Sequence, residues 1–529
     1  MSIAAFAYRW RREISAGVLS GVLLAVSFPP YPLRFFSLFA LVPLIWFFIR
    51  SEKSPGRYGN YLKRGFVLGF VSGLVFFGIL LYWVANVIPA SSVTNRWVLA
   101  PGVLLLVIYL SCFTGLFGMF TAFLVRRYRL RALIAVPALW SIMEVARSNG
   151  ELAFSWGLLA NSLAEYPAAI QALSIYGPYG FSFLIITVNL LTALVLFIRP
   201  IGKKAVMFVL LAVIISVHTG YGMHRIERFD KKRKELPEKN DIAVIQPNVS
   251  LDIKWKPEYK DSIFSQIETL VRKASEDGAD LVIFPETSAP VALSRSRKYR
   301  DWLERIARDS EVELLIGYID HSFKNGRWVS YNTAGLFDAE DGLVEEYHKV
   351  NLLPFGEKIP FSQYFASLEE IDFGQANFKR GREKTLFDSG KGKFGVLICF
   401  ESTFPGYVRD YVRGGAEFLV NITNDGWFGS SRGPLQHSET AILRAVENGV
   451  SVLRAANTGV SMYIDPTGRV RKRLDLNVGG KIECSARSFA SPTIYVRYGN
   501  TIFLVLVILS FAAVVISDPA GLIKKSKSK

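Results

Sequence analysis

Cysteine is scarce in this chain of 529 residues, which contains only Cys112, Cys399 and Cys484. Three thiols argue against a disulfide framework and leave a single thiol at a strand end as a candidate nucleophile. Five histidines are present, and none of them, His437 included, has a neighbouring motif that would orient it as the partner of a cysteine. Cys and His clusters with metal-ligand spacing are also lacking. We therefore expect neither a metal nor another cofactor.

The sequence also lacks a glycine-rich phosphate loop, and its basic residues lack the aromatic platforms typical of nucleic-acid binding. The net charge is nevertheless +17, with 62 Lys and Arg against 45 Asp and Glu. Many of these basic residues lie in short segments between apolar runs, which is the pattern of a membrane protein. We expect a membrane, and no nucleic acid, as a partner.

Hydrophobic residues make up 50% of the chain, which is too apolar for an ordinary soluble enzyme, yet the middle is too charged to lie in a membrane. Most of the long apolar runs approach the ~20 residues that cross a bilayer. These runs cover residues 14–29, 33–49, 66–88, 98–125, 132–146, 178–198, 204–220 and 499–517. We therefore expect one polypeptide to contain both a membrane-spanning part and a part outside the membrane.

Basic residues alternate between the connections of these runs. They are concentrated before the first run and after the second, fourth and sixth, whereas the other connections are nearly free of them. Cytoplasmic loops carry such an excess. The fifth run is short and contains Pro137 and Glu144, but without it the basic segment from Arg199 to Lys204 would lie outside. We predict seven helices, an extracytoplasmic middle region, and a last helix that returns to a basic tail, with both termini cytoplasmic.

After a charged segment the composition becomes that of a soluble α/β domain. Strand-like apolar runs cover 242–246, 281–286, 313–317, 395–399 and 418–421, and helical patterns cover 262–275, 299–310 and 436–449. Such runs with helices between them favour a sheet covered by helices, with reactive groups at strand ends. We predict a transmembrane domain at 1–220, a charged linker at 221–240, an extracytoplasmic catalytic domain at 241–495, and a last helix and basic tail at 496–529.

Three of these strand ends carry reactive side chains. Cys399 ends one buried run, Glu286 ends another, and a glutamate in this position can act as the general base that ionises a thiol. Lys349 could hold the thiolate and a developing oxyanion. Taken singly, a buried core cysteine, a helix-capping glutamate and a solvated lysine are the commoner outcomes.

The combination is more specific. Glu, Lys and Cys in that order resemble the nitrilase superfamily, here as Phe284-Pro-Glu286, His348-Lys349 and Ile398-Cys-Phe-Glu401. The flanking segments and the eight predicted spans resemble, within it, the apolipoprotein N-acyltransferase family. The matching segments are 246–248, 349–357, 421–429, 454–459 and 465–468. The resemblance covers essentially the whole chain, most specifically 241–470, and implies a multi-pass α-helical membrane domain plus an α/β nitrilase-like α-β-β-α sandwich.

The resemblance also implies roles for individual residues. Glu286 would be the general base, Lys349 the stabiliser of the oxyanion and thiolate, and Cys399 the nucleophile. Glu357 and Glu401 would be supporting carboxylates that keep the lysine and the thiol oriented.

Aromatic residues complete the implied site. Trp255, Trp427 and Phe428 would lie near the acyl chain and substrate, although all three could equally be core aromatics. Phe400 stands where we expect a tyrosine after the nucleophile, which removes a hydroxyl from that position and leaves the triad intact.

The implied reaction transfers an acyl chain from a membrane phospholipid to the free α-amine of a lipoprotein's N-terminal diacylglyceryl-cysteine, through a cysteine thioester, at the bacterial inner membrane. Two alternatives stay open: a membrane-anchored amidase that hydrolyses a C–N bond, and a non-catalytic lipid- or lipoprotein-binding membrane protein. The intact Glu, Lys and Cys weigh against the second. The spans and the aromatic segment 360–374, either a mobile arm or a packed excursion, favour acyl transfer over hydrolysis.

Overall fold

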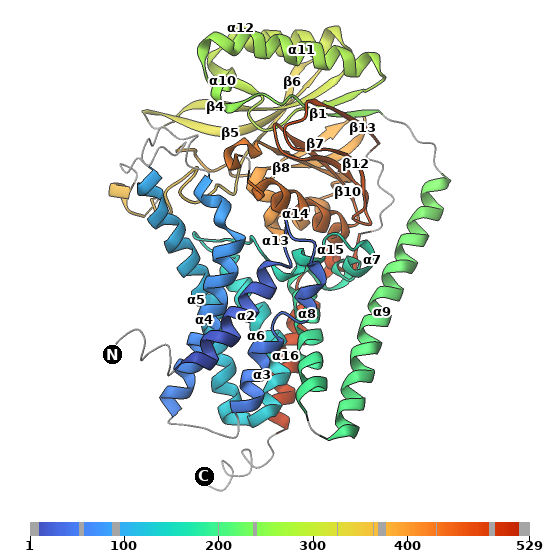
Figure 1. Ribbon diagram of the computed structural model, residues 1–529. Helices are drawn as coiled ribbons and strands as arrows, with labels where there is room; N and C mark the ends of the chain where they lie inside the picture. Colours follow the sequence, from blue (N-terminus) through green and yellow to red (C-terminus); the bar gives the residue numbers. More distant parts are fainter. Residues whose placement is uncertain are drawn as a thin grey trace, which may run out of the picture. The chain divides into compact units, whose positions relative to one another are not determined.

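The computed structural model describes residues 10–51, 58–86, 96–198, 200–235, 241–324, 326–362, 364–368, 377–429, 431–485 and 492–517. The chain divides into two units (Figure 1). The first comprises Met1–Tyr82, Trp97–His224 and Tyr498–Lys529, and the second comprises Trp83–Arg96 and Arg225–Arg497.

The first unit is helical, and each of the eight predicted apolar runs overlaps one of its helices. The longer helices are α2 (Arg11–Ala25), α3 (Val42–Ser51), α4 (Tyr58–Leu80), α5 (Arg96–Tyr128), α6 (Val136–Arg147), α8 (Leu173–Phe197), α9 (Ile201–Lys234) and α16 (Thr501–Ile516). Shorter helices are η1 (Arg34–Leu38), η4 (Arg129–Ala135), η5 (Leu159–Leu163) and α7 (Pro167–Ile170).

Among the described residues, five helical segments are long and apolar enough to cross a membrane: Arg34–Ser51, Asn60–Leu80, Pro101–Arg147, Leu173–Phe197 and Ile201–Lys234. The predicted fourth and fifth runs share one of these segments, α16 is a shorter apolar helix, and α2 has 15 residues. The first unit is therefore a multi-pass membrane domain. Its count of eight spans and its orientation remain predictions.

Small residues let the helices of this unit approach closely. A Cβ placed on Gly21 of α2 would lie 2.6 Å from the carbonyl oxygen of Ser72 in α4, and one on Gly69 of α4 would lie 2.0 Å from that of Thr114 in α5. Backbones in van der Waals contact are the usual basis of helix association in lipid, where burial of apolar side chains supplies little driving force.

Buried hydrogen bonds explain why the short fifth apolar run, residues 132–146, can contain Glu144. Oε1 of Glu144 accepts the backbone N–H of Leu159 at 2.7 Å and the indole N–H of Trp140 at 3.2 Å. Arg147, 4.0 Å from Glu144, donates to the carbonyl oxygen of Trp156 at 2.7 Å. The two charged residues thus fasten the segment after α6 to the helical unit, as expected for intramembrane charges that face the protein interior.

The second unit contains two sheets. In the first, the strand order is β13 (Gly480–Cys484), β1 (Ile242–Gln246), β2 (Leu281–Ile283), β4 (Glu313–Lys324), β5 (Arg327–Asp338) and β6 (Gly342–His348), and β3 (Ala289–Ala292) also pairs with β4. In the second, it is β12 (Val470–Leu474), β11 (Ser461–Ile464), β10 (Ser451–Ala456), β9 (Phe418–Thr423), β8 (Gly392–Ile398) and β7 (Leu386–Ser389). The strands β1, β2 and β4 are parallel, as are β8, β9 and β10.

The helices of this unit are α10 (Leu251–Lys254), α11 (Lys260–Glu276), α12 (Arg297–Asp309), α13 (Pro405–Arg413), α14 (Gly433–Asn448) and α15 (Ile494–Tyr498). Short 3₁₀ turns are η2 (Tyr82–Asn86), η6 (Pro257–Tyr259), η7 (Leu293–Arg295), η8 (Ala366–Leu368), η9 (Cys399–Thr403) and η10 (Asp425–Phe428).

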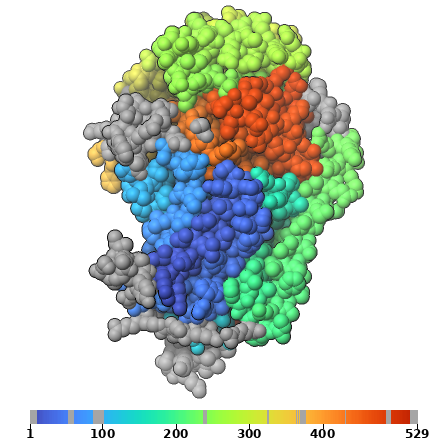
Figure 2. Space-filling view, viewed as in Figure 1, coloured from blue at the N-terminus to red at the C-terminus, as the bar shows by residue number. Residues whose placement is uncertain are grey.

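Alternating side chains of the strands build two apolar cores. In β1, Ile242 and Val244 face the second sheet, whereas Ala243 and Ile245 pack with α11 and α12. The chain thus forms an α-β-β-α sandwich, with α11 and α12 outside the first sheet and α13 and α14 against the second (Figure 1). In the space-filling view α11 and α12 cover the first sheet, whose yellow strands emerge at one edge (Figure 2).

The five predicted strands and three predicted helices of this domain are confirmed, with ends that differ by a few residues except in β4, which continues to Lys324. Helix α9 runs without interruption to Lys234, so much of the predicted charged linker is helical. Residues 236–240 of that linker, and residues 363 and 369–374 of the predicted arm, lie outside the described residues.

Candidate active site

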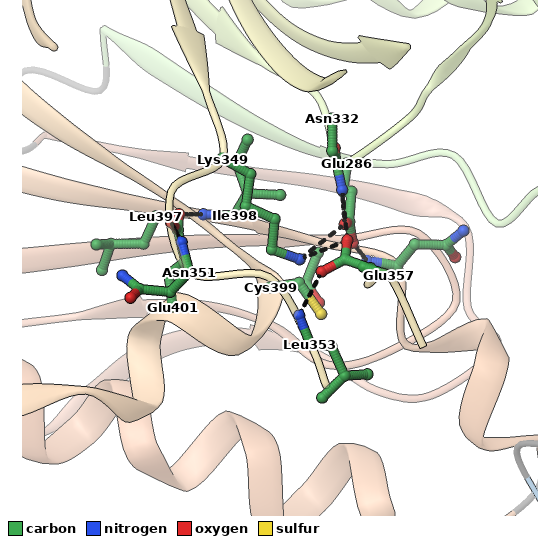
Figure 3. Close-up of polar contacts among 12 residues, drawn as sticks. Glu286, Asn332, Lys349, Asn351, Leu353, Glu357, Leu397, Ile398, Cys399 and Glu401 are labelled. Atoms are coloured by element: carbon green, nitrogen blue, oxygen red, sulfur yellow. Dashed lines mark hydrogen bonds and ion pairs between the residues drawn. The ribbon is translucent and has the colours of Figure 1, made fainter. Parts of the chain in front are cut away.

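Three strand ends of the two sheets bring the predicted triad together. Glu286 follows β2, Lys349 directly follows β6, and Cys399 directly follows β8. In α/β sheets, polar side chains gather outside the carboxyl ends of the strands. Figure 3 shows the ammonium group of Lys349 pointing toward the carboxylates of Glu286 and Glu357, with the sulfur of Cys399 beside them.

Two carboxylates share the lysine. Nζ of Lys349 lies 2.9 Å from Oε1 of Glu357 and 3.7 Å from Oε1 of Glu286. Asn332, from β5, donates to both carboxylates, at 2.7 Å to Glu286 and 3.0 Å to Glu357. The second oxygen of Glu286 accepts the backbone N–H of Asn424 at 2.8 Å. Both carboxylates are thereby fixed in position before any substrate binds.

Lys349 is 1% exposed, and its charge is set by these neighbours. Burial alone would lower the pKa of the amine, but the carboxylates of Glu357 and Glu286 outweigh burial and raise the pKa above its ordinary value. Lys349 therefore remains an ammonium ion, which can stabilise negative charge but cannot accept a proton.

Cys399 occupies a strained position at the start of η9. Its φ is 54°, in the left-handed region that residues other than glycine rarely adopt. Burial and the charge of Glu286 raise the pKa of the thiol, and Lys349 opposes them only in part. The resting residue is therefore a thiol, and it needs a base at the moment of attack.

Glu401 joins the turn that carries Lys349 to the strand that carries Cys399. Its Oε1 accepts the backbone N–H groups of Val350 and Asn351, both at 2.9 Å, and its Oε2 accepts the N–H of Ile398 at 2.9 Å. The hydroxyl of Tyr347 donates a further hydrogen bond at 2.7 Å. Glu401 is fully buried, so it acts as an internal clamp on the backbone of both elements.

The predicted aromatic residues lie in different environments. Trp255 follows α10 and is 37% exposed, and Trp427 is half-buried in η10. The ring of Phe428 packs edge-on against Trp83, with centroids 4.7 Å apart. Phe400 is buried and packs edge-on against Phe404 at 5.0 Å, so its ring has an apolar neighbour. The substrate-binding roles of these aromatics remain predictions.

The sequence shows no motif that would orient His437, but the fold does orient it. Its Nδ1 lies 2.9 Å from Oδ1 of Asp425, and its Nε2 lies 3.2 Å from the carbonyl oxygen of Cys399. Asp425 and His437 are twelve positions apart, and only the packing of α14 beside η10 makes them neighbours.

Asn332 and Asn424 were also missed. Asn424 stands at the end of β9, where the strand-end rule that identified the triad could have found it. Asn332 lies inside β5 and carries no such signal. Among the described residues there is no group of three or more His, Cys, Asp or Glu side chains that could hold a metal ion.

Comparison with known proteins gives matches to two family models and to relatives that cover most of the chain. Residues 241–480 match the carbon-nitrogen hydrolase family, and residues 20–191 match the apolipoprotein N-acyltransferase N-terminal domain. An apolipoprotein N-acyltransferase of Geobacter metallireducens is 34% identical over 507 residues, covering 93% of this chain and 92% of the relative. One of Chlorobaculum tepidum is 30% identical over 482 residues, covering 85% and 86%.

Among solved structures, Nit3 of Saccharomyces cerevisiae, from branch 10 of the nitrilase superfamily, is 22% identical, with a TM-score of 0.37, covering 46% of this chain and 89% of Nit3. The sandwich, its matched family and the helical unit define a membrane-bound enzyme with a carbon-nitrogen hydrolase domain. More narrowly, the chain belongs to the apolipoprotein N-acyltransferase family.

Proposed function

We propose that this enzyme transfers an acyl chain from a membrane phospholipid to the free α-amine of the N-terminal diacylglyceryl-cysteine of lipoproteins, through a thioester on Cys399. The observation that carries the proposal is the buried Lys349, shared between Glu286 and Glu357 beside the thiol. The names of the relatives support the lipoprotein acceptor.

In the first half-reaction, Glu286 takes the proton of the Cys399 thiol as the sulfur attacks the ester carbonyl of the phospholipid. Lys349, together with a backbone amide near Phe400, stabilises the tetrahedral oxyanion. Collapse of the intermediate breaks the ester C–O bond, and the proton on Glu286 passes to the departing lysophospholipid oxygen. The enzyme is left as a thioester with Glu286 ionised again.

In the second half-reaction, the α-amine of the lipoprotein attacks the thioester carbonyl, and Glu286 takes the proton that the nitrogen loses. The C–S bond breaks, and the proton on Glu286 returns to the sulfur. The products are an amide on the lipoprotein and the original thiol. Glu286 thus serves twice because Lys349, held as an ammonium ion, cannot accept a proton.

The lipid donor requires that the site work at the bilayer surface. Bringing a chain of about fifteen methylenes into water would cost on the order of 12 kcal/mol, at ~0.8 kcal/mol each. Exposed aromatics in the described part of the segment 360–374 support contact with lipid: Phe361, Tyr364 and Phe365 are 40%, 71% and 60% exposed, and Phe355, just before the segment, is 56% exposed. We assign this segment as an arm that dips toward the membrane.

The proposed location is the bacterial inner membrane, with the sandwich on the extracytoplasmic side and both termini in the cytoplasm. The alternation of basic and non-basic connections supports this orientation. Reaction of single exposed cysteines with a membrane-impermeant reagent in intact spheroplasts tests it, since only extracytoplasmic positions would be labelled.

Acyl transfer is tested with a phospholipid labelled in its acyl chains and a synthetic diacylglyceryl-cysteine peptide. We expect the label to enter the peptide with the free α-amine and not a matched peptide whose amine is acetylated. Label recovered as free fatty acid, whether or not the peptide is present, would instead identify a hydrolase. Tight lipid binding without any turnover would identify a binding protein.

A further inference from the structure

The carbonyl oxygen of the proposed nucleophile is held by three side chains. Nε2 of His437 lies 3.2 Å from the oxygen of Cys399, the hydroxyl of Ser402 donates to it at 3.1 Å, and the amide of Asn421 donates at 3.4 Å. These groups come from α14, η9 and β9, so separate elements converge on one peptide oxygen. A left-handed conformation such as that of Cys399 persists only where its surroundings hold it.

His437 is itself held by a buried charged pair. Asp425 lies 2.9 Å from its Nδ1, and Arg454 donates to the other oxygen of Asp425 at 2.7 Å. Arg454 also approaches Nδ1 of the histidine, at 3.2 Å. All three side chains are at most 1% exposed. A chain of three buried polar side chains has little freedom, and the imidazole ring cannot turn without breaking it.

Both ring nitrogens face groups that only accept hydrogen bonds. The contact of Nε2 with the Cys399 carbonyl oxygen and that of Nδ1 with the Asp425 carboxylate each require a proton on the ring nitrogen. Nδ1 is occupied by Asp425 and Arg454. Because both nitrogens have partners, His437 has no free nitrogen with which to accept the thiol proton, and Glu286 keeps that role.

We propose that His437 is a positioning residue, which holds the Cys399–Phe400 peptide so that the thiol faces Glu286 and Lys349. Since a trans peptide is planar, fixing the oxygen of Cys399 also fixes the direction of the N–H of Phe400 on the opposite side of the bond. This inference rests on the proposed function, because it assigns importance to the orientation of Cys399. Asp425 orients the histidine, and Arg454 holds both Asp425 and the amide oxygen of Asn421, which is another donor to the same carbonyl.

Two substitutions of His437 test the contributions of its two ring nitrogens separately. In His437→Gln the side-chain amide reaches the position of Nε2 and can still donate to the Cys399 oxygen. In His437→Asn the amide reaches the position of Nδ1 and can contact Asp425, but it falls short of Cys399. The matched control is His321→Asn. His321 lies in β4, and its Nδ1 forms a hydrogen bond with the hydroxyl of Ser330 in β5.

The first readout is the rate at which the full-length enzyme in detergent forms an acyl adduct with phospholipid, followed by intact mass. We expect His437→Asn to slow this step by at least about tenfold with little change in the lipid concentration for half-maximal rate, and His437→Gln to stay within about threefold of the wild type. His321→Asn should match the wild type. Equal losses in the Asn and Gln variants, or full activity of His437→Asn, would overturn the proposal.

A second readout does not depend on the proposed function. Alkylation of Cys399 by iodoacetamide, measured by peptide mass spectrometry, should quicken in His437→Asn and not in His437→Gln, because a thiol turned away from Glu286 loses the buried carboxylate that helps to keep it protonated. If neither His437 variant folds, Ser402→Ala removes another donor to the same oxygen and should slow acylation and quicken alkylation, each several-fold; no change in either would overturn the proposal. A wild-type enzyme that forms no acyl adduct would contradict the proposed function, and alkylation would still decide the role of His437.

Discussion

Glu357 lies closer to Lys349 than Glu286, the proposed base, does: its Oε1 is 2.9 Å from Nζ. The other oxygen of Glu357, Oε2, accepts the backbone N–H of Leu353 at 2.8 Å. The lysine is thereby tied to the turn between β6 and the aromatic segment. Glu286 lies farther from Nζ, at 3.7 Å, and in the proposed mechanism it is the carboxylate that exchanges a proton with the thiol. The two carboxylates are chemically identical, and their different partners give them different roles.

Replacing Glu357 by glutamine tests this division of labour. The substitution keeps the shape but removes the charge that fixes Lys349, so the ammonium should shift toward Glu286 and compete with proton transfer. We expect acyl-adduct formation to slow by about tenfold to a hundredfold, with lipid binding little changed. Glu276→Gln, at an exposed position in α11, is the control. Wild-type rates in Glu357→Gln would contradict the account.

Glu401 should matter for stability as well as for rate. Glutamine at this position would place an amide group against backbone donors, which leaves buried hydrogen-bonding groups unsatisfied at a cost of ~1–3 kcal/mol. We expect Glu401→Gln to lower the thermal unfolding temperature and to slow acylation. The measurement is thermal unfolding in detergent at a fixed scan rate. An unchanged unfolding temperature would show that the clamp between Ile398 and Asn351 is dispensable.

The raised pKa of Cys399 predicts how its reactivity depends on pH. Burial and Glu286 keep the thiol protonated in the folded enzyme, whereas a free cysteine ionises near ~8.5. Alkylation of Cys399 should therefore be slower in the native enzyme than in the urea-unfolded chain, and it should continue to rise above about pH 9 without a plateau. A plateau near neutral pH would mean a preformed thiolate and would remove the need for Glu286 as a base.

Lys254 carries a stability penalty that depends on pH. This buried lysine, whose Nζ lies 3.3 Å from the carbonyl oxygen of Glu286, has its pKa lowered by burial to about 7, with Glu286 opposing. An unfolded lysine titrates near ~10.4, so between these values the unfolded chain binds the extra proton and stability rises with pH. Lys254→Met should raise the unfolding temperature at about pH 7, and the gain should shrink toward about pH 10.

The control for this prediction is Lys256→Met, at an exposed position beside Trp255. It should show no pH-dependent gain. A fall in unfolding temperature at both pH values for Lys254→Met would mean that the amine contributes more through its contacts than its burial costs.

The sequence alone predicted the site residues that stand at the ends of buried strands. Apolar runs that stop at a reactive residue located Glu286 and Cys399, because a buried strand delivers the next side chain to the sheet edge. The pairing of Lys349 with two carboxylates required the resemblance, since one lysine beside a strand is usually solvated. The order of the two sheets, and the return of β13 to β1, depend on contacts between distant segments.

Other features depend on packing that sequence patterns do not encode. Asn332 reaches both carboxylates from β5, which β4 separates from β2 in the sheet, and nothing in the local sequence marks it. His437 looked unoriented because its partners come from η10 and β10. For the membrane domain, composition located the helices. Length and hydropathy together select five segments among the described residues, which leaves the count of eight to experiment.

The central claim is that Cys399 carries the acyl chain. Intact-mass analysis of the purified enzyme incubated with phospholipid alone, beside Cys399→Ala, tests it most directly. The account predicts an added acyl mass on the wild type that is removed by hydroxylamine and absent from the variant. An adduct that persists in Cys399→Ala, or transfer to the lipopeptide by that variant, would contradict it.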